Sequence, residues 1–179
     1  MAMGAVPSVA ERRGLRELED LFREHYELVY RTAYSIVNNT ADAEDVLQNV
    51  FLRLVRRELP PDFTKNVKGY FYRAAVNLSL DTIRSKRRYE LVGDDKRLDG
   101  PVDTADSQRA ERLHRQLVDA LTELTPEAVH ILILRYVHNH SDAEIATMLG
   151  TSRTVIAVRL FRSRARLRKL IRDSMGEES

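Results

Sequence analysis

The sequence predicts an all-α protein with two small helical domains joined by a flexible linker, and three observations lead to this prediction. Apolar residues recur at intervals of three and four along most of the chain, and strand-like alternation is hard to find. Glycine is scarce, with seven residues in 179. Residues 90–108 lack periodicity, are rich in Asp and contain Gly and Pro, as is typical of a linker. We therefore expect a disordered leader over residues 1–12, domains over residues 13–89 and 109–175, and the linker between them.

In the first domain, apolar stripes and breaks in them mark three helices. The first helix covers about residues 15–37, and Thr40 is expected to cap a second helix over residues 41–57. Two consecutive prolines, at 60–61, then prevent continuation of that helix. A long helix over residues 67–88 completes the domain.

The second domain begins with a helix near Arg109, and three further helix starts follow it. Each start has a side chain suited to capping the free N–H groups of a first helical turn. The start signals are Thr125 with Pro126 at the first helical position, Ser141 with Glu144 three residues later, and Ser152. A turn at Gly150 between two of these helices is typical of a helix-turn-helix.

The last helix carries an unusually one-sided charge. Eight Arg and Lys residues occur from Arg153 onward, and no acidic residue lies between Arg153 and Arg172. A solvated helix face normally mixes charges, because pairs of opposite sign four residues apart stabilise it. DNA instead favours a purely basic face, since each neutralised phosphate releases counterions. The pattern therefore indicates DNA binding rather than an ordinary solvated face.

A second basic segment ends the long helix of the first domain. In residues 69–88, GYFYRAAVNLSLDTIRSKRR, aromatic and basic residues are interleaved. This combination suits single-stranded or melted DNA, whose bases stack on aromatic rings. The alternative for Tyr70 and Phe71 is a place in the core.

The composition limits the location and chemistry of the chain. With no cysteine, disulfides and thiolate metal sites are excluded, and a reducing cytoplasm is the expected location. No apolar run approaches the ~20 residues that a membrane span needs, and the first residues lack the apolar segment of a signal peptide.

Three segments in this order resemble the extracytoplasmic-function (ECF, group IV) bacterial RNA polymerase sigma factors. Residues 42–54, DAEDVLQNVFLRL, resemble the helix that binds core polymerase, and residues 69–88 resemble the helix that melts and recognises the −10 element. Residues 120–170 resemble the domain that recognises the −35 element. The resemblance implies a promoter-specificity subunit without chemistry or cofactor of its own. Its implied partners are the clamp helices and flap region of core RNA polymerase, promoter DNA and an anti-sigma protein.

The resemblance also implies roles for individual residues. Core-polymerase contacts are implied for Asp42, Glu44, Asp45 and Gln48. Contacts to the −10 element are implied for Tyr72, Arg73, Asn77, Arg84, Lys86, Arg87 and Arg88, with Asp81 as an orienting partner of Arg84 or Arg73. Contacts to the −35 element are implied for Ser152, Arg153, Thr154, Ala157, Val158, Arg159, Arg162 and Arg166.

The recognition helix departs from the family pattern at two of these positions. Ala157 and Val158 replace polar residues, cannot donate to guanine and are able to touch a thymine methyl group. We therefore expect this domain to depend more on phosphate contacts than its relatives do.

Two other function classes remain open on the sequence alone. The first is a helix-turn-helix transcriptional regulator that never joins the polymerase. The second is a metal-dependent nuclease, for which the HNH segment at residues 138–140 is a weak signal, since two histidines in an inter-helix loop more often form a turn.

Overall fold

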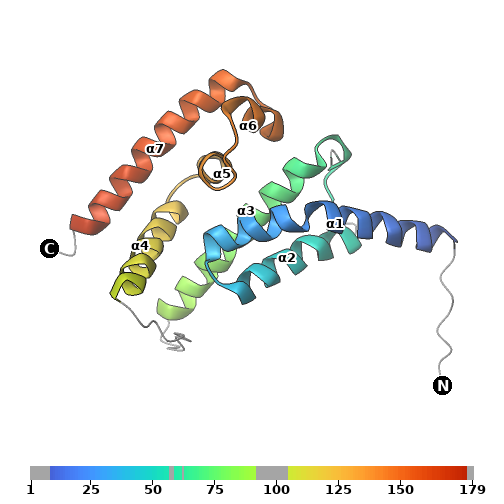
Figure 1. The fold of residues 1–179 in the computed structure, drawn as a ribbon, viewed down its shortest axis with the longest axis horizontal. Coiled ribbons are helices and arrows are strands. Elements are labelled where there is room, and N and C mark those ends of the chain that lie inside the picture. The colour runs from blue at the N-terminus through green and yellow to red at the C-terminus, as the bar shows by residue number, and fades with distance from the viewer. Residues whose placement is uncertain (1–8, 57–58, 62, 92–104, 177–179) are drawn as a thin grey trace.

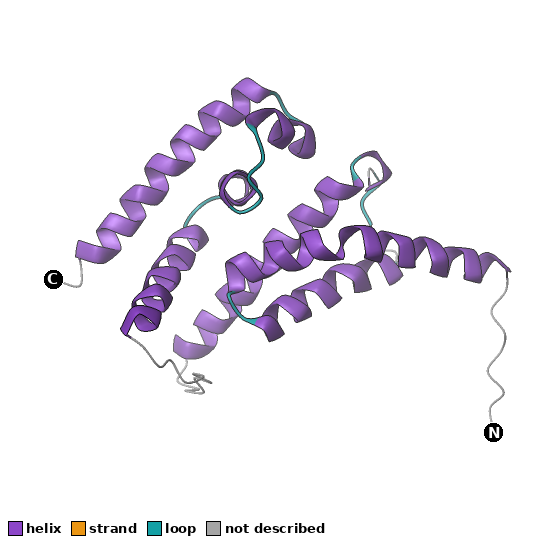
Figure 2. Ribbon diagram, viewed as in Figure 1, coloured by secondary structure: helices purple, strands orange, loops and turns teal. Residues whose placement is uncertain are grey.

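The computed structural model describes residues 9–56, 59–61, 63–91 and 105–176 of the chain. Within these ranges every regular element is a helix, and the remainder consists of short loops (Figure 2). The all-helical fold class predicted from the periodicity is therefore confirmed.

The first part of the chain forms three long helices that pack on one another. These are α1 (Val9–Val37), α2 (Thr40–Val55) and α3 (Val67–Leu91), with a short 3-10 helix, η1 (Phe63–Lys65), before α3. Helix α1 begins inside the segment expected to be a leader, so residues 9–12 are helical. The rest of that segment lies outside the described residues.

The turn between α1 and α2 corrects one prediction. Asn38 has a left-handed φ of 49°, which ends α1. Asn39 is extended, and its side-chain oxygen accepts a hydrogen bond of 3.0 Å from the Asp42 N–H. Asn39 rather than Thr40 is therefore the N-cap, and Thr40 is the first residue of the helix. The prediction of Thr40 was wrong because both residues are good caps, and the backbone turn at Asn38 selects the earlier one.

The second part of the chain contains four helices. They are α4 (Ala105–Thr122), α5 (Pro126–Tyr136), α6 (Asp142–Leu149) and α7 (Arg153–Gly176). The predicted helix starts at Thr125, Ser141 and Ser152 are confirmed, since each hydroxyl accepts from a backbone N–H three residues later. Gly150 ends α6 with a left-handed φ of 67°, a conformation that glycine adopts at no steric cost.

The helices run further into the predicted linker than the sequence indicated. Helix α3 continues to Leu91 and α4 begins at Ala105, so both ends of residues 90–108 are helical. The rest of the linker, residues 92–104, lies outside the described residues.

Helix α3 lies between the two parts of the chain (Figure 1). One of its sides packs on α1 and α2 in an apolar cluster that contains Phe71 and Ala75. Another side contributes Tyr72, Val76 and Leu80 to a cluster that continues into α4, α5, α6 and α7. The described helices therefore share a core that joins both predicted domains through α3.

Candidate polymerase and DNA interface

The acidic face expected on α2 is only partly free. Glu44, Asp45 and Gln48 are exposed on it. Asp42 differs, because its side chain is 15% exposed and forms an ion pair with Lys86 of α3. The pair joins two residues that the sequence analysis placed in different sites, one for polymerase and one for DNA. Three of the four predicted polymerase contacts are thus available on the surface.

The basic face of α7 is open to solvent. Ile156 and Leu160 are 0% and 3% exposed and hold the helix against α5 and α6. Arg159, Arg162 and Arg166 lie on the opposite side and are exposed. Because apolar and basic positions fall on separate faces of one helix, the burial that positions α7 leaves its cations facing outward.

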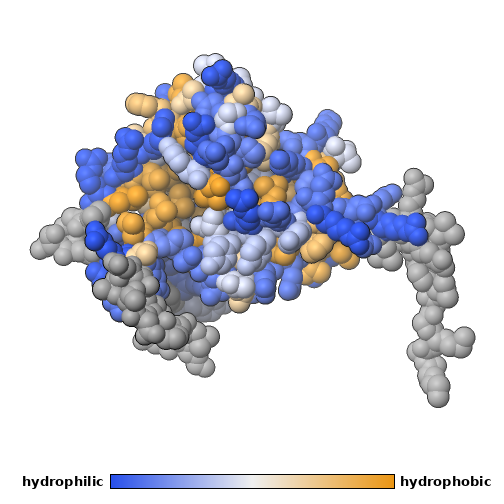
Figure 3. Space-filling view, viewed as in Figure 1, coloured by the Kyte–Doolittle hydropathy of each residue, from blue (hydrophilic) through white to orange (hydrophobic). Residues whose placement is uncertain are grey.

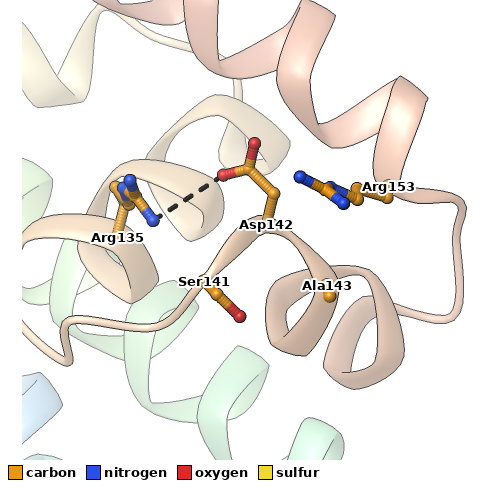
Figure 4. A pocket seen from close by; sticks show the side chains of 5 residues that line it. All are labelled: Arg135, Ser141, Asp142, Ala143 and Arg153. Carbon is orange, nitrogen blue, oxygen red and sulfur yellow. Dashed lines mark ion pairs between the residues drawn. The ribbon is translucent and has the colours of Figure 1, made fainter.

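The first turn of α7 borders a hollow of about 380 Å³ (Figure 4). Asp142 lies in it between two arginines, and Arg153 points toward its carboxylate. Arg135 Nη1 lies 3.8 Å from Asp142 Oδ1, too far for a hydrogen bond, and this buried oxygen has no hydrogen-bond partner. Arg135 is instead held by its own bond of 3.0 Å to the His140 carbonyl. The Asp142 carboxylate can therefore attract the positive charge of Arg153 while the N–H donors of Arg153 stay available.

The middle of α7 presents an apolar stripe beside the arginines. Ala157 and Val158 are exposed, as the thymine-methyl expectation requires. Val155 and Phe161 are also exposed on α7, Phe161 by 69%, although the sequence analysis did not single them out. Exposed aromatic and branched side chains on a recognition helix suit apolar contact with a DNA groove.

Four of the seven residues expected to contact the −10 element bond to the second part of the chain, although Asn77 among them stays exposed. Tyr72 is fully buried, and its hydroxyl donates to the His130 carbonyl at 2.5 Å. Asn77 Oδ1 lies 3.2 Å from His130 Nε2, which donates to it. Arg87 forms an ion pair with Asp119 and donates to Thr122 Oγ1 at 3.1 Å.

The remaining basic residues of α3 are held more loosely. Arg84 lies 3.5 Å from Asp81, which confirms the expected pairing, and also donates to the Thr122 carbonyl at 3.4 Å. Arg73 is half-buried and Arg88 is exposed. Asn77 and the basic end of α3 therefore retain solvent contact, whereas Tyr72 is covered.

Two histidines on the α5 side lie in the same contact region, His130 buried and His138 half-buried. Burial, followed by the nearby Arg73, lowers the pKa of His130 to about 4 against an opposing effect of Glu127. Burial also lowers the pKa of His138 to about 4, with Arg31, His140 and Lys68 acting in the same direction. Both histidines are therefore neutral at pH 7.

His138 links the HNH segment to α1. The segment forms the turn expected of it, with Asn139 at a left-handed φ of 54°. His138 Nε2 lies 2.8 Å from Thr32 Oγ1, whose proton is already donated to the Leu28 carbonyl. His138 therefore donates this bond, which binds the turn to the first part of the chain.

Two searches of the described residues bear on other functions. They contain no group of three or more His, Cys, Asp or Glu side chains placed to hold a metal ion. In the same ranges, no helix combines the length and the apolar character needed to cross a membrane.

Comparison with known proteins identifies the family. Residues 21–89 match Sigma-70 region 2, and residues 114–167 match Sigma-70, region 4. The ECF RNA polymerase sigma factor SigL of Mycobacterium tuberculosis is 30% identical over 162 residues, which are 89% of this chain and 90% of SigL. The chain belongs to the ECF RNA polymerase sigma factors.

Two further relatives in sequence agree with this assignment. The RNA polymerase sigma-E factor of Streptomyces coelicolor is 29% identical to this sigma factor, over 86% of this chain and 85% of the relative. ECF sigma factor SigE of Mycolicibacterium smegmatis is 28% identical, over 95% and 67%. Among solved structures, the sigma factor RpoE of Bartonella quintana, in complex with the anti-sigma factor NepR, matches with a TM-score of 0.49 and 17% identity. That match covers 88% of this chain and 98% of RpoE.

The family decides between the functions left open by the sequence. A helix-turn-helix regulator that never joins the polymerase does not need region 2. This sigma factor contains region 2, and region 4 follows it in the chain. The transcription-initiation interpretation is therefore favoured over the regulator.

Several residues important for the arrangement were not found from the sequence. Asp119, Thr122 and His130 hold α3, and Arg135 and Asp142 line the same hollow as Arg153. Their contacts join residues far apart in the chain, so local periodicity and capping rules do not reveal them.

Proposed function

We propose that this ECF sigma factor directs promoter-specific initiation by assigning separate contacts to three helices. Helix α2 binds core RNA polymerase, α3 recognises the −10 element and α7 recognises the −35 element. The observation that carries the proposal is the separation of exposed charge, with acidic residues on α2 and only basic ones from Arg153 to Arg172 of α7.

The polymerase contact would use Glu44, Asp45 and Gln48. These side chains are exposed together on α2, whose opposite side is anchored by Val46 and Val50 in the core. An exposed acidic face suits the clamp helices if these present basic side chains, because complementary charge speeds association and fixes orientation.

The −35 contact would use the first turns of α7. Ser152, Arg153 and Thr154 begin the helix, followed by the exposed Ala157, Val158, Arg159, Arg162 and Arg166. The arginines supply phosphate contacts, and the apolar positions meet base edges such as thymine methyl groups. Asp142 would hold Arg153 in place until DNA arrives.

The −10 contact would use α3. Asn77 offers an amide to a base edge, and Arg73, Arg84, Lys86, Arg87 and Arg88 surround it with positive charge. Tyr72 would provide a stacking surface once its side of the helix is uncovered.

An apolar strip on the second part of the chain supports the flap contact. Leu113 and Leu117 of α4 are 57% and 36% exposed, and apolar side chains gather between α4 and α7 on the face seen in Figure 3. An exposed apolar patch on a soluble helix bundle marks a protein contact. We assign two partners to this part of the chain. The flap region of the polymerase would bind the apolar face, and an anti-sigma protein would cover the DNA-binding face. The chain itself would act in the cytoplasm, where its polymerase works, and would catalyse no reaction.

The test is transcription in vitro with purified core polymerase on a pool of promoters, followed by sequencing of the starts. We expect starts at shared −35 and −10 sequences that disappear without this sigma factor. Glu44→Lys combined with Asp45→Lys is expected to abolish both capture of core polymerase and transcription. Glu19→Lys combined with Asp20→Lys reverses the same number of charges at adjacent exposed positions of α1, outside the proposed clamp contact, and is the matched control for clamp binding. Absence of core binding by the unaltered chain would disprove the proposal.

A further inference from the structure

The hollow at the first turn of α7 contains a negative charge that phosphate binding does not explain. Its lining residues come from the ends of three helices: Arg135 of α5, Ser141, Asp142 and Ala143 at the start of α6, and Arg153 of α7. A carboxylate beside the proposed −35 contact repels phosphate oxygens, so Asp142 weakens backbone contacts at this place. We therefore looked for a protein group on which Asp142 acts.

The Asp142 carboxylate has one oxygen whose hydrogen-bonding capacity is unused. Its Oδ1 is buried and has no hydrogen-bond partner among the described residues, and only 26% of the side chain is exposed. Arg135 Nη1, 3.8 Å away, contributes charge but no hydrogen bond, because the same nitrogen donates to the His140 carbonyl at 3.0 Å. A buried acceptor in this position is stabilised by a second cation that can approach it.

Arg153 is the side chain placed to supply that cation. It is exposed at the first position of α7 and points toward the Asp142 carboxylate (Figure 4). A guanidinium carries five N–H donors in a planar fork, so attraction on its inner edge leaves the donors of its outer edge free. Two parallel donors of an arginine match O6 and N7 of guanine in the major groove. Because Asp142 restricts the arginine before DNA binds, less side-chain freedom is lost on binding.

We infer that Asp142 is a positioning residue that aims Arg153 at a guanine of the −35 element. Arg153 then reads a base, while the other arginines of α7 hold phosphates. The inference rests on the proposed function, in which α7 meets the −35 element. It gives a guanine preference to a helix whose exposed Ala157 and Val158 cannot donate to that base. Asp142 acts through Arg153 and touches no base itself.

The test uses this sigma factor in complex with core polymerase. The probe is a promoter found in the transcription experiment, with its −35 segment randomised, and the bound duplexes are separated and sequenced. We expect the unaltered chain to prefer guanine at one position of the segment by about tenfold, as a bidentate arginine does. Asp142→Asn, which keeps the shape of the side chain and removes its charge, should reduce this preference to about twofold. Retention of duplexes with other bases should not fall, because a charge that repels phosphate has been removed.

Further variants separate positioning from a structural role of Asp142. Asp142→Glu keeps a carboxylate and should retain most of the guanine preference. Arg153→Lys, at an exposed position, keeps the charge but not the planar fork and should lose the preference. In the Arg153→Lys background, Asp142→Asn should change the preference no further, because the two residues act as one unit. Asp173→Asn makes the same charge change at an exposed position near the other end of α7 and should leave the preference intact.

Three outcomes would overturn the inference. In the first, the unaltered chain selects bases in the −35 segment but no guanine. In the second, Asp142→Asn keeps the full guanine preference. In the third, Arg153→Lys changes retention of every sequence by the same factor, which would make Arg153 a phosphate contact. Failure of the proposed function gives a different result, since the unaltered chain would then select no base in the randomised segment and Arg162→Ala would leave retention of the promoter unchanged.

Discussion

Helices α3 and α7 are both long and rich in arginine, yet they differ in how much of their surface remains open. In α7 the arginines are mostly exposed, and a single apolar side holds the helix in place. In α3 two sides are buried, and several of its cations bond to other helices of the same chain. A basic sequence thus identifies a DNA-binding surface without telling whether that surface is accessible.

The physical origin of the difference lies in the apolar residues. Ile156, Leu160 and Leu167 of α7 fall on one side, so one set of neighbours satisfies them. In α3, Phe71 and Tyr72 are adjacent and point in different directions, and both are fully buried. A helix with two apolar sides needs two sets of partners, and in this sigma factor the second set consists of the other domain and Ile36 of α1.

The largest expected effect is on the free energy of unfolding, and it comes from shortening the buried side chain that holds α7 against its neighbours. Ile156→Ala deletes a fully buried side chain between α6 and α7 and should lower the free energy of unfolding by about 2 to 5 kcal/mol. Urea denaturation measures the loss. Val158→Ala on the exposed side of the same helix is the control and should change stability by less than about 0.5 kcal/mol. Equal losses in the two variants would mean that α7 is not anchored as described.

Acidification should weaken the docking that distinguishes α3. His130 and His138 have pKa values of about 4 when docked, and we expect the ordinary value of 6.5 once the two parts separate. Their contribution is complete above pH 6.5 and is lost as the pH falls toward 4, because the separated chain binds more protons. At about pH 5.5 each histidine should cost docking roughly 1.4 kcal/mol.

Energy transfer between dyes on the two parts of the chain measures this separation. The double variant His130→Gln, His138→Gln should lose most of the pH dependence between pH 7 and 5, although other groups still titrate. An unaltered pH profile in that variant would show that other groups control the contact.

A smaller effect distinguishes α7 from α3 by how the affinity for duplex DNA depends on salt concentration. Arg162→Ala on α7 should reduce the slope of log affinity for duplex DNA against log salt by about 1, as expected for one lost phosphate contact. Arg88→Ala on α3 should leave that slope unchanged in the free chain, because α3 is not the surface that meets duplex DNA. Fluorescence anisotropy at several salt concentrations measures both. The comparison fails if Arg88→Ala changes the slope as much as Arg162→Ala.

Local features of the fold were predictable from the sequence, whereas its long-range contacts were not. The capping box at Ser141 and Glu144, the turn at Gly150 and the division of α7 into two faces follow from residues close in the chain. The bond between His130 and Asn77 joins residues 53 positions apart and depends on how the domains meet. The same holds for Asp42, expected to face the polymerase but paired with Lys86. Such pairs satisfy no local rule, so periodicity and capping rules cannot predict them.

The most direct test of the account is the distance between the two parts of the chain in different states. Spin labels on Arg53→Cys of α2 and Asp173→Cys of α7 lie at exposed positions outside the docking contacts, and the chain has no other cysteine. Pulsed electron paramagnetic resonance should give one narrow distance in the free sigma factor and a different one in the complex with core polymerase and promoter. The same distance in both states would contradict the account, because α3 would then contact the promoter without being uncovered.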